Sequence, residues 1–267
     1  MTRLAVLGSP IAHSLSPALH AAAYRALGLD WEYEAVDVPE GRLGAFLDGL
    51  DADWRGLSLT MPLKREVLPL LADRSALVDL VGAANTVLLD GGLHGFNTDV
   101  DGIVDALADH GIATASRVHV LGMGATAAST LAAAARLGAA EVVVTGRRDA
   151  DDELARIARA LALPLRFRAI GDAAPAGVDL LVNTVPGDLA DDPGVDDAGA
   201  FLEVHYADWP SVRARRWLDG GRPVVSGLEM LLHQAVRQVR VFTAGDEHAV
   251  LPDEPRVVAA MRASIGA

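Results

Sequence analysis

Apolar positions in the first hundred residues form short runs, separated by stretches with helical spacing. Four runs are predicted to be buried strands: Leu4–Leu7, Tyr33–Val36, Leu57–Thr60 and Thr86–Leu89. Three stretches between them are predicted to be helices: Pro17–Leu27, Gly41–Leu50 and Lys64–Leu71. Because strands and helices alternate, this part of the chain is predicted to be an α/β unit with a mostly parallel sheet.

A second series of apolar runs starts at residue 118. The run Val118–Leu121, the helical stretch Thr126–Leu137 and the run Glu141–Val144 fit one βαβ unit. Four more strands are predicted after it: Leu165–Ile170, Leu180–Asn183, Phe201–His205 and Pro223–Val225. We therefore expect a second, Rossmann-like sheet, followed by a helical segment from Gly227 to the end of the chain.

Composition narrows the classes of protein that fit this pattern. A chain of 267 residues suits two modest domains, and the lack of cysteine excludes disulfides and thiolate chemistry. The eight histidines show no metal-ligand spacing, so we expect no metal site. The net charge of −13 argues against nucleic acid and anionic membranes as partners. The run Leu4–Leu7 is too short for a signal peptide, and we expect a soluble, cytoplasmic protein.

A glycine-rich turn joins the predicted strand that ends at Leu121 to the helix that follows it. Gly122, Gly124 and Ala127 form the pattern G-x-G-x-x-A. Glycine lets the main chain approach a pyrophosphate, whose charge is then met by backbone N–H groups at the start of the helix. Such glycines also occur in simple tight connections, but the order of strand, turn and helix favours dinucleotide binding.

The end of the next predicted strand indicates which dinucleotide binds. An NAD site usually has an acidic residue there, which accepts a hydrogen bond from the ribose 2′-hydroxyl. This chain instead has Thr145-Gly146-Arg147-Arg148, and two guanidinium groups suit the 2′-phosphate of NADP. The alternative is a solvated arginine pair in a surface turn, partly neutralised by Asp149. The rule favours NADP over NAD.

Two serines precede the first predicted helix, in the segment Pro10–Pro17. Ser16 followed by Pro17 has the pattern of an N-cap and a first helical residue, which requires no function. Ser14 and Ser16 beside a helix N-terminus would equally suit a carboxylate ligand. The segment by itself leaves both interpretations open.

Four further segments, read together with Pro10–Pro17, favour a functional interpretation. They are GLSLTMPLK at 56–64, GAANTV at 82–87, GFNTDVDG at 95–102 and SGLEMLLHQA at 226–235. In order and spacing, these segments and the glycine turn resemble the shikimate dehydrogenase family over nearly the whole chain. The resemblance implies NADPH-dependent, reversible reduction of 3-dehydroshikimate to shikimate in aromatic amino-acid biosynthesis.

The resemblance also implies a division of the chain. Residues 1–101 and 228–267 would form the substrate-binding and catalytic domain, and residues 102–227 a Rossmann-like NADP-binding domain. The assembly would be a monomer or a homodimer. Two alternatives share this fold: a quinate or quinate/shikimate dehydrogenase, and a non-enzymatic sensor of a shikimate-like acid. The pair Arg147-Arg148 favours a shikimate dehydrogenase that uses NADP over a quinate dehydrogenase that uses NAD. The presence of both Lys64 and Asp99 argues against a sensor.

Site residues follow from the resemblance position by position. The substrate-binding residues implied are Ser14, Ser16, Thr60, Lys64, Asn85, Asp99, Tyr206 and Gln234, with the two serines at the substrate carboxylate. Lys64 and Asp99 resemble the catalytic pair. The cofactor-binding residues implied are Gly122, Met123, Gly124, Ala125, Thr126, Arg147, Arg148, Val204 and Gly227.

The chemistry of the reaction supports Lys64 and Asp99 independently. Oxidation of a secondary alcohol by hydride loss requires a proton to leave the same oxygen, so a positioned acid/base is needed. Lysine can fill this role, and its cation can polarise a ketone oxygen. Taken singly, Lys64 could be a solvated lysine and Asp99 a helix N-cap.

The chain departs from the family pattern at several positions. Ser58 stands where the family usually has Asn, Ala125-Thr126 replace a commoner Gly-Ala, and Gly146 stands where Asn is usual. Around Tyr206, the flanking residues also differ from the usual ones. Ser58 and Ala125-Thr126 keep small side chains, so we expect altered detail and retained binding there, whereas Gly146 cannot make the side-chain contact to the cofactor phosphate that Asn would make.

Overall fold

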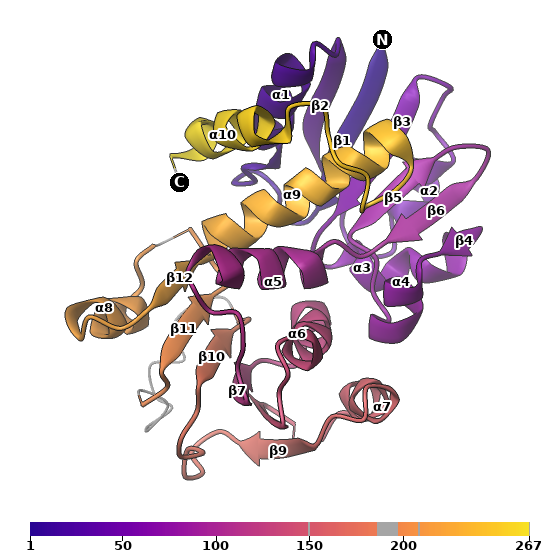
Figure 1. The fold of residues 1–267 in the computed structure, drawn as a ribbon. Coiled ribbons are helices and arrows are strands. Elements are labelled where there is room, and N and C mark those ends of the chain that lie inside the picture. Colours follow the sequence, from indigo (N-terminus) through magenta and orange to yellow (C-terminus); the bar gives the residue numbers. More distant parts are fainter. Residues whose placement is uncertain (149, 186–196, 208, 267) are drawn as a thin grey trace. The chain divides into compact units, whose positions relative to one another are not determined.

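The computed structural model describes residues 1–148, 150–185, 197–207 and 209–266 (Figure 1). The chain forms two compact units, one made of Met1–Asp99 with Leu231–Ala267 and the other of Val100–Met230. Each unit contains its own six-stranded sheet. Over the described ranges, none of the helices is long and apolar enough to cross a membrane.

The sheet of the first unit has the strand order β2-β1-β3-β5-β6-β4. Its strands are β1 (Thr2–Gly8), β2 (Trp31–Asp37), β3 (Trp54–Leu59), β4 (Asp73–Arg74), β5 (Thr86–Leu89) and β6 (Leu93–Phe96). β1 pairs in parallel with β2 and β3, and β4 with β6, whereas β5 is antiparallel to both β3 and β6. Parallel pairings predominate, and the four strands predicted in this half are present.

Two short strands were not predicted from the sequence. β6 reads Leu-His-Gly-Phe, which offers two apolar residues and a glycine, and β4 is only two residues long. Neither forms an apolar run, so each is specified by the backbone hydrogen bonds of its neighbours rather than by its own side chains. The turn between β5 and β6 produces the antiparallel part of the sheet.

The helices of the first unit are α1 (Ser16–Leu27), α2 (Leu43–Leu47), α3 (Leu63–Glu66), α4 (Ala76–Val81), most of α9 (Gly227–Ala244) and α10 (Glu254–Ile265). The predicted helix Lys64–Leu71 is wrong in its length. It consists of α3 and a 3₁₀ turn at Leu68–Leu70, because Pro69 has no N–H and its ring would clash with the carbonyl of Arg65. The predicted C-terminal helical segment is divided into α9 and α10.

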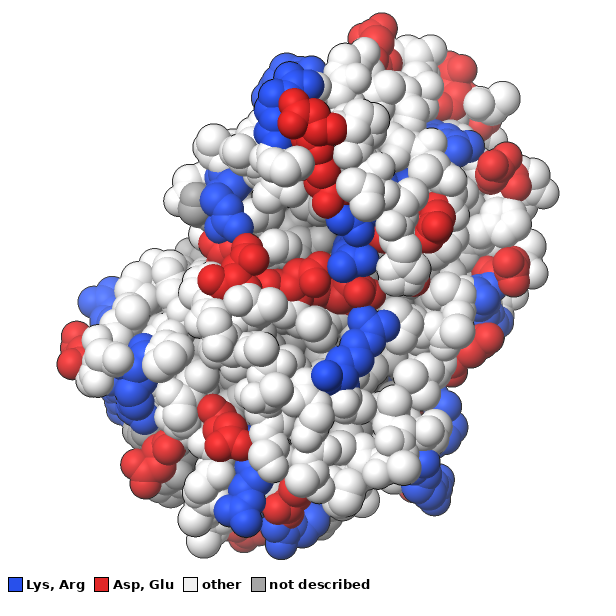
Figure 2. All heavy atoms as spheres, viewed as in Figure 1, with Lys and Arg blue, Asp and Glu red and all other residues white. Residues whose placement is uncertain are grey.

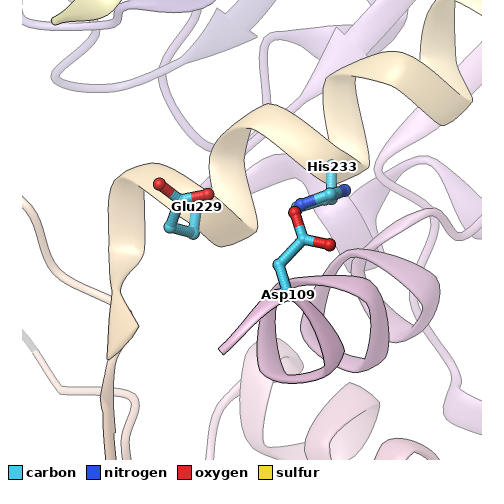
Figure 3. Close-up of side chains that lie close together, drawn as sticks. All are labelled: Asp109, Glu229 and His233. Atoms are coloured by element: carbon cyan, nitrogen blue, oxygen red, sulfur yellow. The ribbon is translucent and has the colours of Figure 1, made fainter. Parts of the chain in front are cut away.

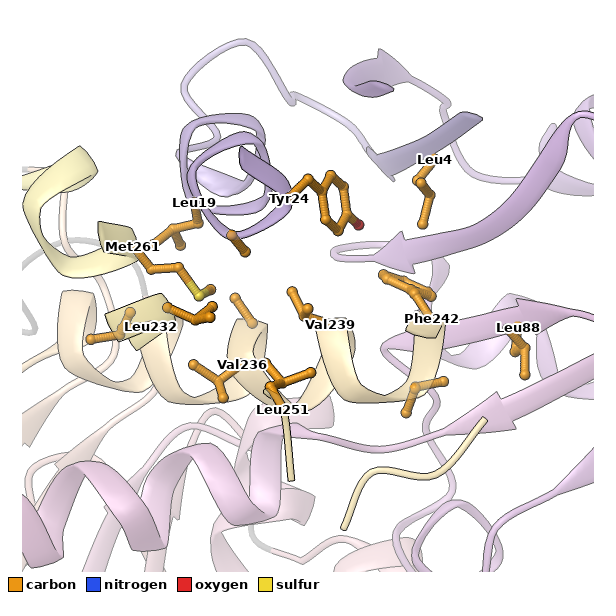
Figure 4. Close-up of a cluster of buried hydrophobic side chains, with 14 residues drawn as sticks. Leu4, Leu19, Tyr24, Leu88, Leu232, Val236, Val239, Phe242, Leu251 and Met261 are labelled. Carbon is orange, nitrogen blue, oxygen red and sulfur yellow. The ribbon is translucent and has the colours of Figure 1, made fainter. Parts of the chain in front are cut away.

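A hydrophobic core attaches these C-terminal helices to the first unit (Figure 4). Leu232, Val236, Val239 and Phe242 recur at helical spacing on α9 and are buried with apolar side chains of α1, α10 and β1. Each fully buried side chain of this size stabilises the fold by about 1.5–3 kcal/mol. This packing fixes which side of α9 faces the interior and therefore where its polar residues lie.

The second unit has an all-parallel sheet with the order β12-β11-β10-β7-β8-β9. Its strands are β7 (Arg117–Leu121), β8 (Glu141–Gly146), β9 (Leu165–Ala169), β10 (Leu180–Asn183), β11 (Ala200–Glu203) and β12 (Val224–Ser226). Its helices are α5 (Asp99–Asp109), α6 (Ala125–Arg136), α7 (Asp152–Ala160) and α8 (Val212–Asp219). The strand order reverses at β7, which is where doubly wound sheets bind ligands at the strand ends. The predicted two-domain α/β class is confirmed.

Charged side chains of both signs are interspersed over the face of the molecule shown in Figure 2. The chain has 36 acidic and 23 basic residues, so acidic groups outnumber basic ones overall. Binding of an anionic ligand therefore depends on local donors.

Candidate functional site

Lys64 and Asp99 form a close ion pair in the first unit. Lys64 Nζ lies 2.6 Å from Asp99 Oδ2, and the side chains are 14% and 5% exposed. Lys64 is on the short helix α3, whereas Asp99 is the first residue of α5. Lys64 is therefore not a solvated surface residue, so that structural alternative is wrong, and Asp99 directs its carboxylate to the lysine.

Asn85 completes this polar centre. Its side-chain Nδ2 donates to Asp99 Oδ1 at 2.9 Å, and its Oδ1 accepts from the backbone N–H of Thr98 at 2.8 Å. The backbone N–H of Ala84 donates to the carbonyl of Lys64 at 2.8 Å, which holds this loop against α3. Because a backbone N–H can only donate, the orientation of the Asn85 amide is determined.

Gln234 reaches the same centre from α9. Its Oε1 lies 3.3 Å from Asn85 Nδ2, and its Nε2 donates to the carbonyl of Leu231 at 2.9 Å. Four segments that are far apart in the sequence thus bring Lys64, Asn85, Asp99 and Gln234 together within the first unit.

Ser14 and Ser16 lie at the start of α1. The helix begins at Ser16, no side chain caps it, and Ser14 Oγ accepts from the backbone N–H of Ser16 at 3.3 Å. The prediction of Ser16 as the N-cap is therefore wrong. The positive end of a 12-residue helix and two hydroxyl groups lie together here, which suits a carboxylate.

Thr60 is half-buried between β3 and α3, four residues before Lys64. Its backbone N–H donates to the carbonyl of Leu7 at 2.9 Å, which ties the segment to the end of β1. Thr60 thus lies on the loop that leads into the catalytic pair.

A buried histidine, His20, and a half-buried tyrosine, Tyr33, lie next to this region. His20 Nδ1 lies 2.9 Å from the carbonyl of Ser16, and its ring stacks on Tyr33 with centroids 3.9 Å apart. Burial lowers the pKa of His20 to about 4 and raises the pKa of Tyr33 above its ordinary value. Both side chains are therefore neutral at neutral pH, so they add no charge to the environment of Ser16.

Tyr206 belongs to the second unit, where it is half-buried just after β11. The other predicted substrate residues belong to the first unit, so neither unit by itself brings Tyr206 together with them. Its ring stacks on that of His205, with centroids 6.5 Å apart.

The predicted dinucleotide turn lies between β7 and α6 in the second unit. Gly122 has a φ of +110°, and a Cβ atom there would lie 2.3 Å from Thr184 Oγ1. Gly124 precedes α6, which has no side-chain cap and no acidic residue in its first turn. Glycine is thus required at Gly122, and the backbone N–H groups of Ala125 and Thr126 point out of the helix start without a side-chain acceptor. These features fit a pyrophosphate.

Arg147 and Arg148 follow β8 and are exposed. Arg148 forms an ion pair with Asp151, whose carboxylate also caps α7 by accepting from two backbone N–H groups. The prediction that Asp149 neutralises the pair concerns a residue outside the described ones. Both guanidinium groups lie at the strand end where a 2′-phosphate is expected.

Gly146 lies next to the side chain of Met123 in the glycine turn. A Cβ atom on Gly146 would lie 2.6 Å from the sulfur of Met123. The methionine side chain therefore occupies the space that a larger residue at Gly146 would need. Farther along the sheet, a Cβ on Gly227 would lie 2.1 Å from the carbonyl oxygen of Val204, so these two predicted cofactor residues are adjacent.

One group of possible metal ligands is found among the described residues: Asp109, Glu229 and His233 (Figure 3). Glu229 and His233 are one turn apart on α9, and Asp109 ends α5. Because His233 belongs to the first unit and the acidic residues to the second, these residues do not define a metal site within either unit.

Two residues of the polar centre were missed in the sequence. Thr98 donates to Asn85, and Gln238 donates to the Asn85 carbonyl and to Thr86. Gln238 stands four residues after Gln234 on α9, and this helical spacing is the signal that could have identified it.

Comparisons with known proteins agree with this geometry. A family model described as the shikimate dehydrogenase substrate binding domain matches residues 6–87. The chain is 36% identical to the NADP(+) shikimate dehydrogenase of Thermus thermophilus, with 100% of each covered. A solved shikimate dehydrogenase of Mycobacterium tuberculosis has a TM-score of 0.87 and 37% identity, covering 98% of this chain and 100% of that one. A Thermus thermophilus shikimate 5-dehydrogenase solved with NADP(H) and shikimate has a TM-score of 0.82 and 34% identity, covering 99% and 100%.

Proposed function

The chain belongs to the shikimate dehydrogenase family, and we propose that it reduces 3-dehydroshikimate reversibly to shikimate with NADPH. This reaction belongs to aromatic amino-acid biosynthesis. The observation that carries the proposal is the close ion pair of Lys64 and Asp99, with Nζ and Oδ2 2.6 Å apart. This pair supplies the acid/base that interconversion of a ketone and an alcohol requires.

The reaction follows from the positions of these side chains. When bound, the nicotinamide cofactor supplies the hydride to the ketone carbon. Lys64 donates a proton from Nζ to the ketone oxygen, and Asp99 holds the ammonium group in place with one carboxylate oxygen. In the oxidising direction, Lys64 receives the proton of the substrate hydroxyl. In the reducing direction, the ammonium charge of Lys64 also stabilises the negative charge that develops on the ketone oxygen.

The remaining predicted residues would orient the substrate. Ser14 and Ser16 bind its carboxylate at the start of α1, while Thr60, Asn85 and Gln234 bind its hydroxyl groups. Tyr206 is a predicted substrate residue as well, and it belongs to the second unit. The first unit is thus the substrate-binding and catalytic domain in this proposal.

The second unit binds NADP in the same proposal. Gly122, Met123, Gly124, Ala125 and Thr126 surround the pyrophosphate, Val204 and Gly227 line the site, and Arg147 and Arg148 bind the 2′-phosphate. No acidic residue in the first turn of α6 opposes an anionic ligand there. A cytoplasmic location stays a prediction, and so does an assembly that is either a monomer or a homodimer.

The test is an absorbance assay at the reduced-nicotinamide band, with shikimate or quinate offered against NADP or NAD. We expect NADP reduction with shikimate, and a loss of about 10²–10⁴ in kcat for Lys64→Ala. The matched control is Arg65→Ala, which removes the neighbouring cation on α3 and should keep most of the activity. Turnover mainly of quinate with NAD would contradict the proposal, and so would tight binding of shikimate without any turnover.

A further inference from the structure

Gln238 is a residue of α9, and its side-chain amide is buried. It is 2% exposed, and all its polar groups are hydrogen-bonded. Its Nε2 donates to the backbone carbonyl of Asn85 and to Thr86 Oγ1, both at 3.1 Å, and its Oε1 accepts from Ser58 Oγ at 2.8 Å. Burying an amide is costly unless it is bonded in this way, so its partners determine its orientation.

These hydrogen bonds have a defined direction. The Asn85 carbonyl can only accept, so the Gln238 atom that faces it must be the NH₂ group. The Ser58 hydroxyl then donates to Gln238, and Tyr33 donates to Ser58 at 2.6 Å. The Thr86 hydroxyl accepts from Gln238, which leaves its proton for Asn85 Oδ1, 2.9 Å away.

The same chain of hydrogen bonds continues to the catalytic pair. Asn85 Oδ1 accepts from Thr86, so the Asn85 NH₂ group faces Asp99 Oδ1 at 2.9 Å. The other oxygen of Asp99 accepts from Lys64 at 2.6 Å. Gln238 is thus linked to Lys64 through three side chains, all within the first unit.

We infer that Gln238 is a positioning residue: the backbone N–H of Thr98 orients the Asn85 amide, and Gln238, by bonding both the Asn85 carbonyl and the Thr86 hydroxyl, holds Asn85 in place against Asp99. Its effect on catalysis rests on the proposed function, whereas its effect on Asn85 does not. Gln238 acts through Asn85 and not on the substrate directly.

Ser58 is the natural place to test this assignment further. It lies directly opposite Thr86 in the antiparallel pair of β3 and β5. Such residues have Cβ atoms about 4.5–5.5 Å apart, so an amide at position 58 would lie beside Thr86.

The first experiment follows the side-chain amide of Asn85 by NMR and needs no activity assay. The chain has only three asparagines, Asn85, Asn97 and Asn183, so selective ¹⁵N-asparagine labelling gives three side-chain amide pairs in an NMR spectrum. In Gln238→Leu, we expect the Asn85 signals to shift and their hydrogens to exchange faster. Asn183, in the second unit, should be unchanged. Thr86→Val keeps the shape of the side chain and removes the hydroxyl that links Gln238 to Asn85, so it should shift the same signals.

The second experiment measures turnover. We expect kcat for shikimate to fall by about 10- to 100-fold in Gln238→Leu, since a misplaced catalytic group has losses of this order. The Kd for NADPH should stay at the wild-type value. Thr243→Val is the matched control, because it removes a hydroxyl bond within the same helix and should leave kcat and the Asn85 signals unchanged. The double variant Gln238→Leu with Ser58→Asn should recover much of the lost kcat and the wild-type Asn85 signals.

Asn85 signals that do not move in Gln238→Leu or Thr86→Val overturn the inference, whatever happens to kcat. A fall in kcat without movement of Asn85 also overturns it. If wild-type protein fails to turn over shikimate while the Asn85 signals respond as expected, the proposed function fails and the positioning of Asn85 by Gln238 stands.

Discussion

The two units of this protein build their candidate sites in different ways. In the first unit, the site consists of side chains from segments that are far apart in the sequence: Lys64, Asn85, Asp99 and Gln234. In the second unit, the site is mainly the backbone of one continuous turn, from Gly122 to Thr126. Side-chain chemistry therefore depends on tertiary packing, whereas the backbone site depends on local conformation.

This difference predicts which substitutions should inactivate each site. A site made of hydrogen-bonded side chains should lose activity when one of them is replaced by a residue of the same shape, even though the fold stays intact. A backbone site should instead tolerate most side-chain changes and fail where a Cβ atom cannot be accommodated.

Asp99→Asn should break the first site most strongly. The substitution keeps the shape and removes the charge that holds Lys64, so kcat should fall by about 10²–10⁴. NADPH binding, measured by fluorescence titration, should remain at the wild-type level. Asp109→Asn makes the same chemical change at the other end of α5 and serves as the control. A kcat close to wild type in Asp99→Asn would exclude Asp99 from the catalytic pair.

Gly122→Ala should break the second site. Alanine at a φ of +110° is strained, and its Cβ would lie 2.3 Å from Thr184 Oγ1. We expect the binding of NADPH to weaken by about 2–4 kcal/mol, measured by the same titration. Gly138→Ala is the matched control, because it places an alanine at a positive φ of +77° just after the other end of α6, outside the glycine turn. Equal NADPH affinity in the two variants would contradict the prediction.

His20 should make the first unit sensitive to acid. Burial holds its folded pKa at about 4, below the ordinary value of 6.5, so the unfolded chain binds the proton more readily between these values. The free energy of unfolding should be highest above pH 6.5 and fall as pH decreases toward 4, by about 3 kcal/mol from this group.

Urea unfolding over this pH range measures the effect. His20→Phe should flatten the acid side of the curve, whereas His13→Asn, which changes an exposed histidine, should leave it unchanged. An identical acid slope in His20→Phe and wild type would refute the assignment to His20.

Substitutions in the arginine pair should have the smallest effect, which is a change in the preference for NADP over NAD. Arg148 is already engaged by Asp151, so Arg147→Ala should lower the preference for NADP over NAD more than Arg148→Ala does. We expect a loss of about tenfold, or roughly 1.4 kcal/mol, for Arg147→Ala. The measurement is the ratio of kcat/KM values for the two cofactors. An unchanged ratio in both variants would place the 2′-phosphate elsewhere.

Much of the fold was predictable because its strands are apolar runs. The strands at β1, β2, β3 and β5, and the alternation of the second unit, follow from residues that are contiguous in the chain. β4 and β6 could not be predicted, because their pairing partners and not their own side chains specify them. The length of α3 could have been predicted from Pro69.

The candidate site was predictable by resemblance, and its backbone part also by pattern. The glycine turn can be identified from the chain alone, because a strand, a turn that needs glycine and a helix start are neighbours in it. Three features follow from packing instead: Asp99 faces Lys64, Ser16 is not the N-cap of α1, and Gln238 donates to the carbonyl of Asn85. Those contacts join residues as far apart as 153 positions, and no local spacing can specify which buried donor meets which acceptor.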